Sequence, residues 1–205
     1  MLSTLAKYNL GEDLSSFIKK GRENFGQSFL SYEFGTYSQS IEDYDNAMDE
    51  FITHLINEKN YQSIIERKIL LMSDEEEAIP IIEKKLLKAS ELYPNPILNI
   101  LSEFYFKQQK YNLSIQTKKD WTIKGNKDFS DWIKFANDFR NEGQYQHAID
   151  AYYFVLSYKL NPKLTEKALL GLGQTFDDQI TSPKNLYLIP YFYDNNIFFK
   201  NPFQE

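Results

Sequence analysis

Residues 129–162 read FSDWIKFANDFRNEGQYQHAIDAYYFVLSYKLNP. Trp132, Phe135 and Phe139 recur at a spacing that places large side chains on one face of a helix. Gly143 breaks the pattern where a residue of positive φ would end that helix. The hydrophobic pattern resumes directly afterwards. The stretch therefore predicts two antiparallel helices joined by a short turn.

The second helix of this pair is predicted from Ala148, Tyr152 and Val155, which fall at positions i, i+4 and i+7. The small Ala148 suits the point at which the two helices approach closely. Asn161-Pro162 is expected to close the unit, because proline disfavours helix at the residue before it.

The same pattern occurs 34 residues earlier in the chain, with Gln109-Lys110 at the place of the turn. A fixed period of this length indicates stacked helix pairs instead of one closed core. The matching residues are Leu98, Leu101, Ser102, Tyr105, Tyr111, Ser114 and Ile115, which recur as Trp132, Phe135, Ala136, Phe139, Tyr145, Ala148 and Ile149.

These positions carry a resemblance to the tetratricopeptide repeat family. The residues that follow its consensus are Trp132, Phe135-Ala136, Phe139, Gly143, Tyr145, Ala148, Tyr152 and Pro162. The resemblance implies an all-α, right-handed superhelical solenoid of antiparallel helix pairs, whose concave groove binds peptides or helices of partner proteins. Asn161-Pro162 and the run 168–173 are also similar to bacterial cell-envelope repeat proteins, which predicts a bacterial source.

When the 34-residue period is extended in both directions, it divides the whole chain into an N-terminal arm, tandem repeats and a C-terminal segment. Residues 1–27 are expected to form an N-terminal helical arm or cap, and residues 28–178 the tandem repeats. The repeat boundaries are 28–58, 59–94, 95–128 and 129–165, followed by a first helix at 166–178 with Leu169, Leu172 and Phe176 on its packed face. Residues 179–205 form an aromatic-rich segment, interpreted as a truncated repeat of a longer protein.

The unit at 59–94 matches the period least well. Ser73-Asp-Glu-Glu76 has the pattern of a capping box, which predicts a helix start. Pro80 conflicts with that start, because a proline inside a helix removes a hydrogen bond. Either the helix begins nearer Ala78 or it kinks at Pro80.

Composition excludes several classes of function. The net charge of −6 and the isoelectric point of about 5.1 disfavour nucleic-acid binding, which requires a concentrated excess of lysine and arginine. No stretch reaches the roughly 18 apolar residues of a membrane span. The first ten residues do not resemble a signal peptide, so a cytoplasmic protein is expected, or a cell-envelope protein if a leader precedes Met1.

The sequence offers no candidate catalytic, cofactor-binding or metal-ligating residue. His54 and His147 belong to units that are not neighbours, and the acidic run 74–77 lacks the alternating pattern of a calcium loop. Motifs for nucleophilic catalysis and for phosphate binding are also missing from the sequence. We therefore expect a protein that is not an enzyme and that needs no cofactor.

The resemblance instead predicts an adaptor that binds a protein or peptide in the concave groove. The alternatives are a structural module that forms homo-oligomers through the aromatic C-terminal segment, and a regulatory repeat region of a larger protein. The groove residues implied by the repeat frame are Tyr32, Thr36, Gln39, Asn99, Glu103, Phe106, Lys107, Ile133, Asn137, Arg140, Asn141, Leu170, Gln174 and Asp177.

Overall fold

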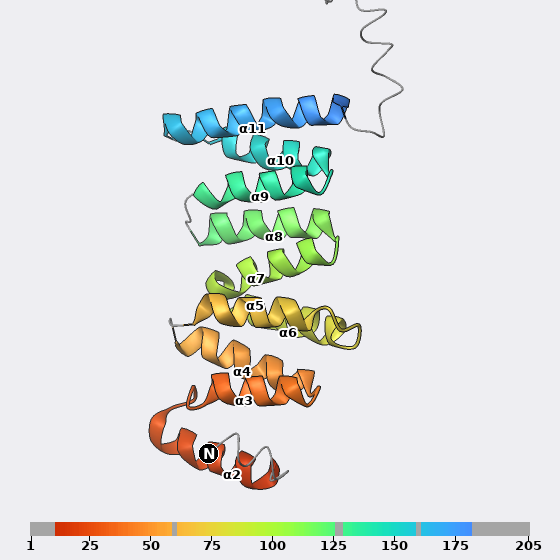
Figure 1. The fold of residues 1–205 in the computed structure, drawn as a ribbon. Coiled ribbons are helices and arrows are strands. Elements are labelled where there is room, and N and C mark those ends of the chain that lie inside the picture. The colour runs from red at the N-terminus through yellow and green to blue at the C-terminus, as the bar shows by residue number, and fades with distance from the viewer. Residues whose placement is uncertain (1–10, 59–60, 126–128, 159–160, 182–205) are drawn as a thin grey trace, which may run out of the picture. The chain divides into compact units, whose positions relative to one another are not determined.

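The protein is helical throughout the part that the computed structural model describes, which is residues 11–58, 61–125, 129–158 and 161–181 (Figure 1). Ten α-helices and no strand occur in these ranges, which confirms the all-α prediction. The expected aromatic segment at 179–205 lies almost entirely outside them, as does the start of the N-terminal arm. The helices fall into two compact units, which span residues 1–127 and 128–205.

The first unit contains seven of the described helices (Figure 1). A continuous core runs through it and includes the completely buried side chains of Phe51, Ile65, Ile82 and Phe104. The helices are α2 (Gly11–Phe25), α3 (Ser31–Ser40), α4 (Tyr44–Asn57), α5 (Gln62–Met72), α6 (Ala78–Leu92), α7 (Pro94–Lys107) and α8 (Tyr111–Lys124).

The second unit contains α9 (Ser130–Asn141), α10 (Tyr145–Leu156) and α11 (Pro162–Thr181). Trp132, Phe139 and Tyr152 have no exposed surface, and Phe135 is buried too. The face predicted from residues 129–162 is therefore the face that packs, because rings at this spacing on α9 meet the neighbouring helix together.

The turns inside two helix pairs repeat the same geometry 34 residues apart. Gly143 has a φ of 69°, as predicted, and Gln109 occupies the equivalent place with a φ of 57°. The next amide donates back to the carbonyl of the preceding helix in both turns, from Lys110 to Tyr105 at 2.9 Å and from Gln144 to Phe139 at 2.8 Å. The left-handed residue lets the chain reverse while the last carbonyls of the helix stay bonded.

Asn161 lies outside any helix, as expected before a proline, but Pro162 is already the first residue of α11, which starts earlier than the first helix expected at 166–178. Proline fits the first helical position, where its missing N–H has no helical partner to lose. Asn161 caps this end, since its Oδ1 accepts a hydrogen bond from the amide of Leu164 at 2.9 Å.

The capping box predicted at residues 73–76 is also wrong, because Ser73 ends α5 instead of starting α6. Its hydroxyl donates to the carbonyl of Leu70 at 2.7 Å and so satisfies the C-terminal end of α5. Helix α6 begins at Ala78, which is the first of the two alternatives posed by Pro80. Pro80 then lies in the first turn, where a proline is tolerated.

Helix α11 packs through a face that is shifted by one residue from the prediction. Leu172 is buried as predicted, but Leu169 and Phe176 are 56% and 41% exposed, whereas Ala168 and Thr175 are completely buried. Gly171 explains the shift, because a Cβ at this position would lie 2.5 Å from the ring of Tyr152. The helix turns its smallest residue toward the Tyr152 ring of α10, and Leu169 and Leu170 face away.

Replacing Gly171 with alanine should therefore destabilise the second unit. The Tyr152 ring is fully buried and its hydroxyl is hydrogen-bonded to Asn137, so moving the ring would disrupt packing and this hydrogen bond. We expect the Gly171→Ala variant to lose about 1–3 kcal/mol of unfolding free energy in urea denaturation followed by circular dichroism.

Gly173→Ala is the matched control on the same helix, because nothing lies within 4 Å of the added methyl. This variant should gain about 0.5–1 kcal/mol from the better helix propensity of alanine. Equal effects of the two substitutions would contradict the packing described for α11.

Candidate functional site

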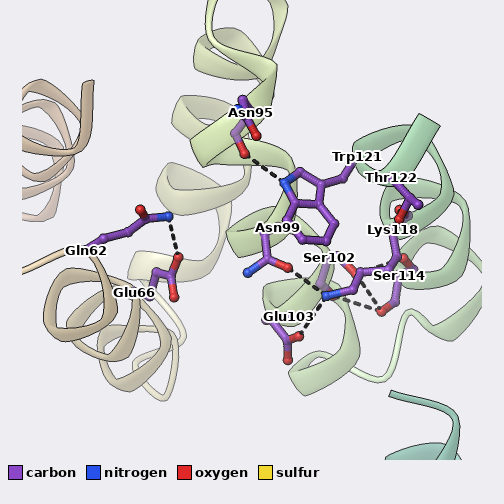
Figure 2. Close-up of polar contacts among 10 residues, drawn as sticks. All are labelled: Gln62, Glu66, Asn95, Asn99, Ser102, Glu103, Ser114, Lys118, Trp121 and Thr122. Carbon is purple, nitrogen blue, oxygen red and sulfur yellow. Dashed lines mark hydrogen bonds and ion pairs between the residues drawn. The ribbon is translucent and has the colours of Figure 1, made fainter. Parts of the chain in front are cut away.

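Two of the predicted groove residues, Asn99 and Glu103, lie one helical turn apart on α7 and meet a lysine from α8 (Figure 2). Lys118 Nζ donates to Asn99 Oδ1 at 2.7 Å and lies 3.7 Å from Glu103 Oε1. All three residues belong to the first unit, where α7 and α8 form an antiparallel pair. They form the centre of the candidate site.

Lys118 is unusual because its side chain is only 4% exposed. Burying an ammonium group costs free energy unless partners replace its hydration shell. Asn99 and Glu103 supply an amide oxygen and a carboxylate, and the Trp121 ring lies under the ammonium group with its centroid 4.7 Å from Nζ. The charge is thereby held in one place.

Trp121 also fixes the beginning of α7. Its Nε1–H donates to the backbone carbonyl of Asn95 at 2.8 Å, which links α8 to the first turn of α7. The indole therefore has one edge bonded to the backbone and one face against Lys118 (Figure 2). Such a bonded ring is well suited to form the wall of a binding site.

The close approach of α7 and α8 places these groups in contact. Ser102 Oγ donates to the Ser114 carbonyl at 2.9 Å, and Ser114 Oγ donates to the Ser102 carbonyl at 2.8 Å. Both residues have no exposed surface, and they occupy the small positions predicted by the 34-residue period. Small side chains let the two backbones approach, so Lys118 can reach α7.

Helix α5 supplies the opposite wall with Gln62, and Glu66 lies one turn further along the same helix (Figure 2). Gln62 Nε2 donates to Glu66 Oε1 at 3.1 Å across one helical turn. Burial raises the pKa of the Glu66 carboxyl, and the negative charge of Glu103 adds to this effect. Hydrogen bonds from Gln62 and Asn99 and the charge of Lys118 act in the opposite direction, but the pKa remains above its ordinary value.

The other predicted groove residues of the first unit have structural contacts. Lys107 forms an ion pair with Asp74 at 2.7 Å, which ties α7 to the turn after α5. Phe106 meets the ring of Tyr111 edge-on. On α3, Tyr32 packs against the rings of His54 and Tyr61, the Thr36 hydroxyl donates to the carbonyl of Tyr32, and Gln39 is half-buried.

In the second unit, the predicted groove residues mostly connect α9 to the helices around it. Asn137 Oδ1 accepts a hydrogen bond from the Tyr152 hydroxyl at 2.5 Å. Arg140 donates to Gln174 Oε1 at 2.6 Å and lies 3.2 Å from Asp178. The other predicted residues of this unit are Ile133, which is half-buried, and Asn141, Leu170 and Asp177, which are exposed.

Sequence reasoning did not find Gln62, Glu66, Asn95, Lys118 and Trp121. One signal was present for Lys118, because it lies 34 residues before Tyr152, a position that is buried in the repeat frame. A charged residue at a core position requires polar partners. Both residues reach equivalent positions of the first helix, Lys118 to Glu103 and Tyr152 to Asn137.

The two histidines have packing roles. His54 is buried with its Nδ1 3.0 Å from the hydroxyl of Ser31, and His147 stacks on Phe139. Among the described residues, no three histidine, cysteine, aspartate or glutamate side chains gather closely enough to hold a metal ion. None of the helices in these ranges is long and apolar enough to cross a membrane.

The raised pKa of Glu66 has a consequence for stability. A folded-state pKa above the ordinary value of 4.5 means that the folded protein holds this proton more tightly than the unfolded chain. The wild-type protein therefore loses stability as the pH rises through 4.5 and through the raised value. We expect Glu66→Gln to be more stable than the wild-type protein to urea at pH 7.

This advantage should shrink below pH 4.5, where both the folded and the unfolded wild-type chains carry a protonated Glu66. Glu76→Gln is the control, because Glu76 is exposed in the turn between α5 and α6. A wild-type protein that is more stable than Glu66→Gln at pH 7 would show that the carboxylate is fully compensated.

Comparison with known proteins gives one family. The model of the ChAPs family, described as Chs5p-Arf1p-binding proteins, matches residues 5–167, which is about four fifths of the chain. No curated protein matches the chain. The family match does not establish tetratricopeptide repeats, and it gives no support to a bacterial source or to self-association.

Proposed function

The chain belongs to the ChAPs family, and from this premise we propose that it is an adaptor that binds a partner protein at the site between α5, α7 and α8. The family is described by what its members bind, which agrees with a protein-binding role at a coarse level. The finer proposal is that a segment of the partner lies across the first helices of successive pairs. Asn99 and Glu103 would then be part of the surface that it contacts.

The buried lysine is the observation that carries this proposal. If the residue at position 118 were needed only for packing, an apolar side chain would do equally well, because a buried ion pair contributes little net stability. Lys118 instead holds Asn99 and Glu103 in fixed positions next to a small polar cavity. Fixed polar groups lower the entropic cost of binding a partner.

The amides at the entrance of the cavity suit an extended peptide. Gln62 and Asn95 are exposed and lie on different helices, so each can exchange hydrogen bonds with a backbone between them. We further propose that the helix pairs are tetratricopeptide-like repeats arranged in a right-handed superhelix. The partners proposed for this chain are the two proteins in the family description, Chs5p and Arf1p.

The experiment measures binding of purified Chs5p and purified Arf1p to the immobilised chain by biolayer interferometry. The variant is Gln62→Ala/Asn95→Ala, which removes two exposed amides and leaves the Trp121 bond to the Asn95 backbone in place. We expect this double variant to bind at least one of the two proteins about tenfold more weakly, a loss of about 1.4 kcal/mol.

Asn57→Ala provides the control, because Asn57 is an exposed amide on α4 of the same unit. It should bind as the wild-type chain does, and all variants should retain the helical circular dichroism spectrum. Equal binding by the double variant and the wild-type chain would place the partner site elsewhere. Failure of the wild-type chain to bind either protein would contradict both proposed partners.

A further inference from the structure

A cavity of about 150 Å³ lies between α5 and the α7–α8 pair. At roughly 30 Å³ for each water molecule, it has room for about five non-hydrogen atoms. A side-chain head group fits this volume. The cavity is lined by Gln62, Asn95, Pro96, Asn99 and Trp121.

The charges around the cavity are unequal. Lys118 and Glu103 lie 3.7 Å apart on the side formed by α7 and α8, so their opposite charges largely offset one another. Glu66 stands on the other side, bonded to the neutral amide of Gln62. Two carboxylates thus share one ammonium group, and the remaining charge at the cavity is negative.

The state of Glu66 supports the same conclusion. Its pKa is raised in spite of Lys118 and two amide hydrogen bonds, so the environment favours loss of the negative charge. An incoming cation would remove this cost. Groups that are unfavourable in the free protein and favourable in a complex are typical of binding sites.

We infer that the cavity binds one basic side chain, an arginine, from the partner segment. The inference rests on the proposed function and names the chemistry of the partner at this point. A guanidinium group with its adjoining methylene has five non-hydrogen atoms, which matches the volume. Its planar fork of donors suits the Glu66 carboxylate and the neighbouring oxygen of Gln62, while a lysine ammonium is a point charge with no such match.

The walls of the cavity fit the flat shape of this group. Trp121 is fixed by its bond to Asn95, so its ring presents a rigid surface at the edge of the cavity (Figure 2). The Lys118 ammonium group is directed to Asn99 Oδ1 at 2.7 Å and is shared with Glu103. The incoming guanidinium therefore meets Gln62 on the opposite wall, beside the Glu66 carboxylate to which Gln62 donates.

The first test uses the full chain and a small probe. The protein contains two tryptophans, so two indole N–H signals are expected by nuclear magnetic resonance, and a Trp121→Phe variant assigns them. N-acetyl-arginine amide should shift the Trp121 signal in a saturable way. N-acetyl-citrulline amide has the same shape without the charge and should cause at most one fifth of that shift at equal concentration.

Glu66→Gln should weaken binding of the arginine probe at least fivefold, and Glu76→Gln should leave it unchanged. Both variants lose one negative charge, so only Glu66→Gln tests the cavity itself. Equal shifts with the arginine and citrulline probes would overturn the inference. No shift of the Trp121 signal with the arginine probe at millimolar concentrations would also overturn it.

The second test separates this inference from the proposed function. Glu66→Gln should bind the partner at least fivefold more weakly than the wild-type chain, although the same variant is expected to be more stable. If Gln62→Ala/Asn95→Ala weakens binding and Glu66→Gln does not, the site is correct and the arginine is not its ligand. If the wild-type chain binds neither Chs5p nor Arf1p, both proposed partners are contradicted. The probe titration alone then decides whether the cavity binds arginine.

Discussion

The fold rests on the close approach of two antiparallel helices in the pairs α3–α4, α7–α8 and α9–α10. Ser102 and Ser114 exchange hydrogen bonds between their hydroxyls and carbonyls, and the equivalent Ala136 and Ala148 of the second unit are completely buried as well. Small side chains at these positions let large rings pack on either side of them. The same principle places Gly171 against Tyr152 and determines which face of α11 is covered.

The candidate site is a direct result of this geometry. Because α7 and α8 approach closely, Lys118 reaches Asn99 and Glu103 from the neighbouring helix and is almost completely removed from water. In the second unit, Tyr152 and Asn137 occupy the positions of Lys118 and Glu103 and form a neutral hydrogen bond. One scaffold position thus carries a charged contact in one unit and a neutral contact in the other, so the repeat geometry is kept while its surface chemistry changes.

Membership of the ChAPs family and the polar site support one coarse conclusion, which is that this chain binds proteins. The site adds a physical reason for it. Stability alone does not account for a buried lysine or for a carboxylate whose pKa is raised by its surroundings. Both features are consistent with a surface whose electrostatic balance is completed by a partner.

The pattern of residues was enough to predict the all-α fold, the helix pairs of the repeated stretch and the residues that pack inside them, because a 34-residue period and a helical spacing are local properties of the chain. It also predicted Asn99 and Glu103 as surface residues of α7. It did not determine the face of α11, the start of that helix at Pro162 or the ending of α5 at Ser73, since these depend on which neighbour each residue meets. Glu66 of α5 and Lys118 of α8 come near one another only in the folded chain, because α6, α7 and more than one repeat length separate them in the sequence. Partners across such distances are decided by the packing of whole helices, which a periodic pattern does not encode.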